Sequence, residues 1–399
     1  MKKTIYLISF ALLGLSAISC QKEIMTAEID LAEEPILFSV KTPETKGQPP
    51  LTRFLNGLAE QDFSVSIWYS AEGTDYYTST IPYVLNHRFG TTEEPQAITE
   101  NTTWMGISRD AEGNISHDPI YYPLDGSLSF FCYAPFRDPE EHQDILIVNN
   151  PPEAIQTLPN YLPGSPSILF TPEMEVSNQI DFIASVPVLN WKKGMGEIPL
   201  NFPKHLTSKI QFYCDFSGIK NEEEKIYISS IEIQNVVGSE YLYFTKDEDG
   251  TLGFEWSKNV SPVEGTQEMP KASYLLSTTN GALSSEDYLL LHDPEDPAKN
   301  YTYVNGKANG WMYVLPQEFS EGQPQLIITY DIVNGSRIVE TNSLTYDLRG
   351  TAAWPLGQTL RYYITVNIAD REDMVVHTVR INDWEDAGNV QDNPEELLH

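Results

Sequence analysis

The chain has 399 residues, of which 57 are acidic and 25 are basic, and its formal net charge at pH 7 is −32. Such a charge repels phosphate backbones and anionic headgroups, which excludes nucleic acid as a partner. Three cysteines are too few for a disulfide-stapled module, whereas the length is sufficient for two domains.

The N-terminus has the features of an export signal. Lysines at positions 2 and 3 precede an apolar stretch at residues 5–15, and a short segment of mostly small residues then leads into Cys20. The stretch is too short for a bilayer-spanning helix, which needs about 20 apolar residues, but it suits a signal-peptide core. The segment resembles the lipobox of a bacterial lipoprotein, which implies removal of residues 1–19 and lipidation of Cys20. An ordinary secretory signal cleaved near Ser19 is the alternative.

The remaining chain alternates apolar and polar residues with the period of two that is typical of strands. The runs that show this alternation lie at residues 36–40, 63–69, 326–332, 360–368 and 375–381. Turn signals rich in Pro, Gly, Asn and Asp lie at residues 123–127, 246–250, 292–297 and 333–336. No long amphipathic helix is evident. We therefore predict an all-β fold made of antiparallel β-sandwiches.

A polar segment at residues 191–197 interrupts two strand-rich halves. It predicts an N-terminal β-sandwich domain at residues 30–192 and a C-terminal β-sandwich domain at residues 196–387, with an acidic tail at residues 388–399. The Pro-rich, polar segment 42–50 follows the first strand and is predicted to be an exposed loop that proteases cut easily.

Catalytic signatures are absent from the sequence. There is no G-x-S-x-G elbow, no H-E-x-x-H, no phosphate loop and no G-x-G-x-x-G. The histidines are scattered without metal-ligand spacing, and His377 falls on an apolar strand face that favours a core position. We expect no catalytic residues, no metal site and no cofactor.

The cysteines and the acidic loops each leave an alternative open. Cys132 and Cys214 fall in apolar strand patterns and are predicted to be buried, with a disulfide between them as the alternative. Residues 246–250 are predicted to form a hairpin turn rather than a calcium loop, because a threonine stands where the first carboxylate of an EF-hand should be. The acidic loop at residues 292–300 could hold calcium or simply be solvated.

Aromatic residues are abundant, with seven tryptophans and 22 tyrosines. Exposed, they would suit a sugar-stacking surface. Four of the tryptophans, however, sit in or beside strand patterns, where packing in a core is the commoner use: Trp68, Trp104, Trp311 and Trp354.

Six segments in fixed order resemble the fimbrillin families of Bacteroidetes, the Mfa-like and FimA-like pilus subunits. The segments lie at residues 119–136, 181–188, 198–216, 312–317, 354–368 and 379–384. The resemblance implies two transthyretin-like β-sandwich domains and a lipoprotein precursor exported to the outer membrane. It also implies that a trypsin-like protease removes the first strand and that a strand of a neighbouring subunit replaces it.

The chain contains candidate residues for this mechanism. Ile36, Phe38 and Val40 are the apolar residues of the removable strand. Lys46 stands where the family usually has the arginine that is cut, and Arg53 is the alternative cleavage site. The lysine at position 46 argues against an arginine-specific protease there. The C-terminal tail lacks alternating apolar residues and is a poor donor strand.

We therefore expect a structural and adhesive subunit of a cell-surface fimbria, without enzymatic activity. Its expected partners are other fimbrial subunits through strand exchange, the outer membrane through the Cys20 lipid, and surface ligands of host or bacterial cells. The first alternative is a surface glycan-binding lipoprotein of a nutrient-uptake system. A second is a calcium-dependent or hydrolytic β-sandwich enzyme, which would need a polar cleft with converging carboxylates.

Overall fold

The computed structural model describes residues 30–41, 62–76, 80–93, 98–99, 101–110, 112–217, 224–258, 260–263, 269–277, 302–303, 311–319, 324–349, 353–367 and 373–381. Several predicted features lie outside these residues: Cys20, Lys46, Arg53, the loop 292–300 and the acidic tail. None of the helices in the described part of the chain has the length and apolar character needed to cross a membrane.

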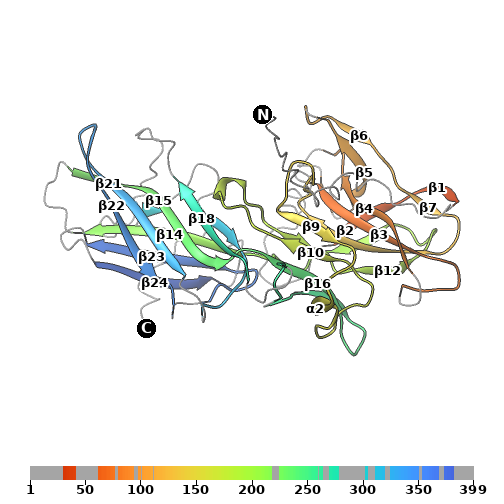
Figure 1. Ribbon diagram of the computed structural model, residues 1–399. Helices are drawn as coiled ribbons and strands as arrows, with labels where there is room; N and C mark the ends of the chain where they lie inside the picture. Colours follow the sequence, from red (N-terminus) through yellow and green to blue (C-terminus); the bar gives the residue numbers. More distant parts are fainter. Residues whose placement is uncertain are drawn as a thin grey trace, which may run out of the picture.

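The described chain is almost entirely β-structure and forms two lobes, as Figure 1 shows. Each lobe contains sheets packed face to face around apolar side chains. This confirms the predicted all-β, β-sandwich fold. The helical elements among the described residues are single turns, α2 (Glu153–Gln156) and η2 (Val176–Asn178).

The first lobe, on the right of Figure 1, contains three sheets. The nine-stranded sheet has the order β11-β8-β3-β4-β5-β2-β13, with β12 added beside β8 and β6 beside β5. Its strands are β2 (Leu37–Lys41), β3 (Phe63–Ser70), β4 (Ile81–Gly90), β5 (Thr103–Arg109), β6 (Ile115–His117), β8 (Ser127–Ala134), β11 (Ile183–Ala184), β12 (Val188–Trp191) and β13 (Ile198–Asn201). A two-stranded sheet pairs β1 (Leu31–Pro35) with β7 (Tyr121–Pro123). A four-stranded sheet has the order β17-β16-β10-β9 and consists of β9 (Ile145–Val148), β10 (Ser167–Phe170), β16 (Glu240–Lys246) and β17 (Leu252–Trp256).

The second lobe is a two-sheet sandwich on the left of Figure 1. One sheet consists of β14 (Ser208–Ser217), β19 (Thr302–Tyr303), β20 (Trp311–Val314), β23 (Thr359–Asn367) and β24 (Asp373–Ile381). The other has the order β18-β15-β21-β22 and consists of β15 (Glu224–Val237), β18 (Lys271–Ser277), β21 (Gln325–Asn334) and β22 (Arg337–Asp347). The apolar faces of both sheets meet in one core.

Strands of the first lobe come from both sides of the segment 191–197. β13 and the hairpin β16–β17 follow that segment in the sequence, yet β13 pairs with β2 and β16 pairs with β10. The chain thus enters the second lobe with β14 and β15, returns to the first lobe for β16 and β17, and re-enters the second lobe with β18. The turn at residues 246–250 joins β16 to β17, where the Gly250 amide donates to the Asp247 carbonyl at 2.9 Å. This confirms the predicted hairpin turn.

The central strands β3 and β8 of the nine-stranded sheet are buried on both faces. On β3, Phe63, Val65 and Ile67 point into an inner core, whereas Trp68 packs into a second core shared with the four-stranded sheet. The serines that alternate with these residues are also buried, with Ser64 fully inaccessible to solvent. The polar face that the alternating sequence suggested therefore does not meet water. This face packs against the four-stranded sheet, so the serine hydroxyl groups need hydrogen-bond partners within the protein.

Asn86, which lies at a β-bulge in β4, makes hydrogen bonds with two of these serine hydroxyl groups. The bulge shifts the register between β3 and β4 and leaves Asn86 at a φ of 50°, in the left-handed region that asparagine tolerates. Its Oδ1 atom accepts hydrogen bonds from the Ser64 hydroxyl at 2.6 Å and the Tyr133 hydroxyl at 2.7 Å. Its backbone amide donates to the Ser66 hydroxyl at 3.1 Å.

The first prediction concerns this asparagine. Asn86→Ala should lower the free energy of unfolding by about 2–4 kcal/mol, because two buried hydroxyl groups lose their acceptor. Asn86→Gly removes the same acceptor but tolerates the positive φ, and it should be less damaging by about 1 kcal/mol. Urea unfolding of both variants measures the difference. Equal stability of Asn86→Ala and the wild type would contradict the role given to Asn86.

The second prediction concerns Glu240, the first residue of β16, whose side chain is buried and accepts a hydrogen bond from the Lys258 amide. Burial raises the pKa of Glu240 from its ordinary value of 4.5 to about 7, against the smaller opposing effect of that amide. Between these two values the folded chain holds a proton that the unfolded chain has lost, so this group's contribution to stability falls as pH rises from about 4.5 to 7.

Glu240→Gln keeps an acceptor for the Lys258 amide and cannot ionise. Its free energy of unfolding should exceed that of the wild type by an amount that grows across this pH window, reaching on the order of 3 kcal/mol at pH 7. Urea unfolding of both proteins at a series of pH values measures the difference. A difference that does not change with pH would contradict the prediction.

Candidate functional site

The candidate site is the position that residues 30–41 occupy in the first lobe. Near its start, the Asp30 carbonyl accepts the Leu124 amide at 2.8 Å, and β1 pairs with β7. The Ile36 amide then donates to the Ile120 carbonyl at 2.7 Å, and the chain continues into β2. This segment is extended along its whole length, and its contacts are to residues far away in the sequence.

β2 lies between β5 and β13. It runs antiparallel to β5, with Phe38 opposite Trp104, and parallel to β13, with Phe38 opposite Ile198 and Val40 opposite Leu200. The β2–β13 and β14–β23 ladders are the parallel ones among the named strands that the structure describes. Because β2 has a partner on each side, its removal would leave both β5 and β13 with unpaired backbone groups.

The side chains of Ile36, Phe38 and Val40 share one buried face, as the alternating sequence predicts. All three are at most 1% exposed. The Phe38 ring makes edge-on contacts with the rings of Phe63, Phe89 and Phe130, at centroid distances of 5.9, 4.8 and 5.4 Å. Such aromatic pairs stabilise by about 0.5–1.5 kcal/mol each beyond the area that they bury. The opposite face of β2, with Leu37 and Ser39, is only partly buried.

Asp62, the first described residue after the segment 42–61, is held in place by Arg109. Asp62 is 2% exposed, and its carboxylate receives two hydrogen bonds from Arg109 on β5, at 2.5 and 2.7 Å. The carboxylate raises the pKa of the Arg109 guanidinium. Gly90 makes room for this pair, because a Cβ atom there would lie 2.5 Å from an Asp62 oxygen. Asp62, which directly precedes β3, is therefore held by side-chain hydrogen bonds that do not involve residues 30–41.

The structure brings together some of the predicted site residues and leaves others untested. Ile36, Phe38 and Val40 lie in one apolar cluster. We call the space that they fill between β5 and β13 the slot. Lys46, Arg53 and Cys20 lie outside the described residues, so their proposed roles remain predictions. In the sequence, Lys46 and Arg53 both fall between the end of β2 and Asp62, so a cut at either residue would separate residues 30–41 from the chain that follows.

The walls of the slot were not identified from the sequence. They include Trp104 on β5, Phe89 on β4, and Ile198 and Leu200 on β13, all fully buried. Each belongs to an apolar run that could have been recognised as a strand. No local signal, however, indicates that β13 pairs with a strand about 160 residues earlier in the chain.

The other residues considered from the sequence lie in cores. Cys132 is a free, buried thiol, and burial raises its pKa, which is the opposite of what a reactive cysteine needs. Trp68, Trp104 and Trp354 are at most 3% exposed, which confirms packing rather than a sugar-stacking surface for these three. The side chains of Cys214, Trp311 and His377 are outside the description.

Known proteins match this chain by structure and not by sequence. No protein-family model matches, and no curated protein matches. A fimbrial protein from Bacteroides vulgatus is similar in structure, with a TM-score of 0.50 and 14% sequence identity over 86% of this chain and 98% of that protein. A candidate cell adhesion protein from Bacteroides ovatus has a TM-score of 0.44 and 13% identity, covering 90% of this chain and 100% of its own. At such identities, the similarity to the first of these shows a shared fold.

The third prediction concerns the residue at the centre of the slot. Phe38→Ala should lower the free energy of unfolding of the first lobe by about 3–5 kcal/mol, because a cavity replaces a ring that is enclosed on all sides. Leu37→Ala, on the half-buried face of the same strand, should cost about 1 kcal/mol. Urea unfolding followed by tryptophan fluorescence measures both. A loss in Phe38→Ala no larger than that in Leu37→Ala would contradict the role of Phe38.

Proposed function

We propose that this chain is a structural and adhesive subunit of a cell-surface fimbria, assembled by β-strand addition. The observation that carries the proposal is β2, a short strand with apolar residues at alternate positions that fills a slot between two other strands. A second polypeptide with the same alternation could fill the same slot and make the same backbone hydrogen bonds.

Proteolysis is the step that would open the slot. A cut after Lys46 or Arg53 separates residues 30–41 from the chain, while Asp62 and Arg109 keep the start of β3 in place. The cut segment is then held only by noncovalent contacts and can be exchanged. The loss of its covalent connection lowers its effective concentration at the slot, which favours a competing strand from a neighbouring subunit.

The slot also defines what a donor strand must look like. Backbone groups of β5 and β13 bind any extended chain, and they supply affinity without selecting a sequence. Selection comes from the apolar pockets of Ile36, Phe38 and Val40, which are spaced two residues apart. A donor therefore needs three apolar residues at alternate positions, with a large ring or its equivalent at the centre.

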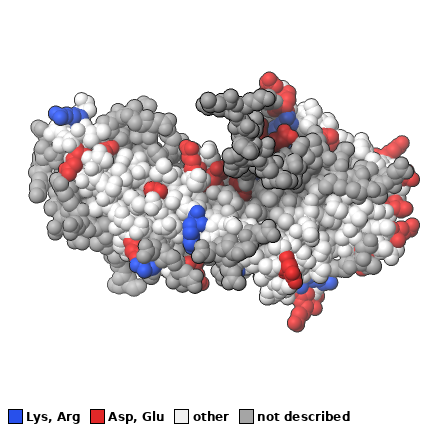
Figure 2. All heavy atoms as spheres, viewed as in Figure 1, with Lys and Arg blue, Asp and Glu red and all other residues white. Residues whose placement is uncertain are grey.

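Export as a lipoprotein fits this scheme. We propose that Cys20 carries the lipid that anchors the precursor to the outer membrane, and that the processing cut releases the lipid and the first strand together. The fold shared with a fimbrial protein from Bacteroides vulgatus supports a surface role of this kind. The acidic surface is compatible with crowded copies that remain soluble, and the described residues on the face in Figure 2 form no broad basic area.

The described residues contain no comparable observation in favour of the glycan-binding alternative. It needs aromatic side chains that are exposed and form a platform. Among the tryptophans whose side chains the structure describes, Trp68, Trp104, Trp256 and Trp354 are buried. Trp191 is half-buried, and its indole N–H donates to the Gly196 carbonyl at 3.2 Å.

The fourth prediction tests assembly directly. Trypsin treatment of the full chain should give a new N-terminus at Gly47 or Phe54, followed by a ladder of oligomers that resist SDS and dissociate on heating. A double variant with Lys46→Gln and Arg53→Gln should remain uncut at this position and monomeric. N-terminal sequencing and unheated SDS gels provide the two readouts.

A peptide competitor distinguishes strand addition from other modes of association. A synthetic peptide of residues 30–41, added in excess, should suppress the oligomer ladder by refilling the slot. The matched control peptide carries Ile36→Ser, Phe38→Ser and Val40→Ser and should have no effect. A processed protein that stays monomeric under all conditions would overturn the assembly proposal.

A further inference from the structure

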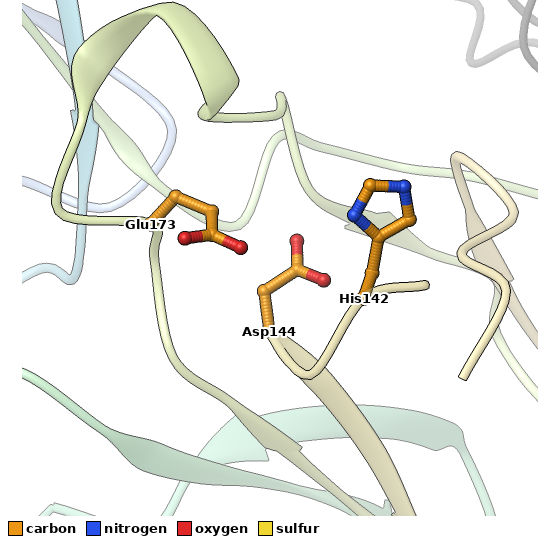
Figure 3. A group of neighbouring side chains, drawn as sticks. All are labelled: His142, Asp144 and Glu173. Carbon is orange, nitrogen blue, oxygen red and sulfur yellow. The ribbon is translucent and has the colours of Figure 1, made fainter. Parts of the chain in front are cut away.

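A second group of side chains in the first lobe has the composition of a metal site. His142, Asp144 and Glu173 each place one possible ligand atom within 4.8 Å of the others. Figure 3 shows that the three side chains point toward one another from two separate stretches of chain. The sequence gives no hint of this group, because Glu173 lies far from the other two and no ligand-spacing motif is present.

The backbone explains why these residues meet. Asp144 directly precedes β9, and its carbonyl accepts the Thr171 amide, just beyond β10, at 2.8 Å. β9 and β10 are paired in register, with Ile145 opposite Phe170, so Glu173 follows closely on the neighbouring chain. His142 is held by a turn in which its amide donates to the Asp138 carbonyl at 2.8 Å. The pairing of β9 with β10 therefore brings His142, Asp144 and Glu173 together.

Asp144 carries a polar atom that needs a partner. Its side chain is 1% exposed, and the Oδ2 atom accepts a hydrogen bond from Arg137 Nε at 2.8 Å. The Oδ1 atom is buried and has no hydrogen-bond partner among the described residues. An unpaired oxygen of a buried carboxylate is costly, and a cation bound there would satisfy it.

The ligand types indicate which ion fits. An imidazole with two carboxylates suits a borderline divalent ion such as Zn²⁺ better than Ca²⁺, which prefers oxygen ligands alone. Ligands of a tetrahedral zinc with bonds of about 2.1 Å lie about 3.5 Å apart, so the group must close slightly around the ion. His142 and Glu173 are only half-buried and can move inward.

Arg137 is compatible with such a site although it is positively charged. Its Nε atom donates to Asp144 Oδ2 at 2.8 Å and its Nη2 atom to the Asn178 carbonyl at 3.1 Å. Its Nη1 atom lies 3.4 Å from His142 Nε2, so the other ring nitrogen, Nδ1, is the one left to bind the ion. A hydrogen bond to the second oxygen of a ligating carboxylate is the usual way in which proteins orient that ligand. Two carboxylates against one guanidinium also leave the group with a net negative charge, which attracts a cation.

The position of the site gives it a structural consequence. Glu173 lies on the loop 171–179, which reaches from the first lobe into the second. The Met174 carbonyl accepts the Leu275 amide at 3.0 Å, Gln179 accepts the Tyr313 amide at 2.7 Å, and Val176 is part of the second-lobe core. An ion bound to Glu173 and Asp144 would tie the root of this loop to the edge of β9.

We propose that His142, Asp144 and Glu173 bind one Zn²⁺ ion, which fixes the loop 171–179 at the junction of the two lobes. The site is distinct from the β2 slot and does not depend on the fimbrial function.

The fifth prediction tests the site by titrating the full chain with ZnCl₂ at 150 mM NaCl, by isothermal calorimetry and against a chromophoric chelator. The wild type should bind one zinc ion saturably at this site. His142→Ala and Glu173→Gln should each weaken this binding at least about tenfold. Glu141→Gln, which removes the same charge one residue away from His142, should bind as the wild type does.

Two further measurements sharpen the outcome. Zinc should slow amide hydrogen exchange in the loop 171–179 of the wild type and not of Glu173→Gln, and circular dichroism confirms that each variant is folded. An excess of CaCl₂ should not displace the zinc. The proposal is overturned if the wild type shows no saturable binding, if the His142 and Glu173 variants bind as tightly as the wild type, if calcium displaces zinc at comparable concentration, or if the exchange rates of the loop do not change.

Discussion

β2 joins β5 to β13, and the nine-stranded sheet is continuous only because β2 lies between them. Without β2, two strands would present unpaired backbone groups, and the rings around Phe38 would face an empty space. Both consequences are unfavourable in water, one because polar groups lose partners and the other because apolar surface is exposed. The inner core of the first lobe is therefore organised around residues 30–41. This segment is joined covalently to the rest of the lobe only through residues 42–61.

A second constraint on the first lobe is that, over much of the nine-stranded sheet, neither face is exposed to solvent. The four-stranded sheet covers it, and half of that covering sheet comes from the hairpin β16–β17, which lies beyond β14 and β15 in the sequence. Each lobe also packs a side chain into the core of the other. Val176, from the loop 171–179, lies in the second-lobe core, and Leu315, which follows β20, lies in the core beneath the hairpin β16–β17. This mutual insertion couples the folding of the two lobes, because neither core is complete without the other's chain.

The apolar residues of the first strand could be predicted from the sequence, but the strands that enclose them could not. Alternation alone places Ile36, Phe38 and Val40 on one face, since successive side chains of a strand point in opposite directions. The strands that flank them could not be predicted in the same way. β5 lies more than 60 residues downstream and β13 about 160, and pairing over such separations depends on the whole sheet. The group of His142, Asp144 and Glu173 was missed for the same reason, because two paired strands bring it together.

The sequence by itself determined the strand-rich character of the chain, the apolar face of its first strand and the hairpin at residues 246–250. These are local properties, set by the two-residue period of strands and the conformations that turn residues allow. Only the tertiary structure decided that Ser64 and Ser66 are buried, that β2 lies between β5 and β13, and that β16 and β17 belong to the first lobe. Those outcomes depend on which sheet covers which, and burial is a property of the assembled layers rather than of any single strand.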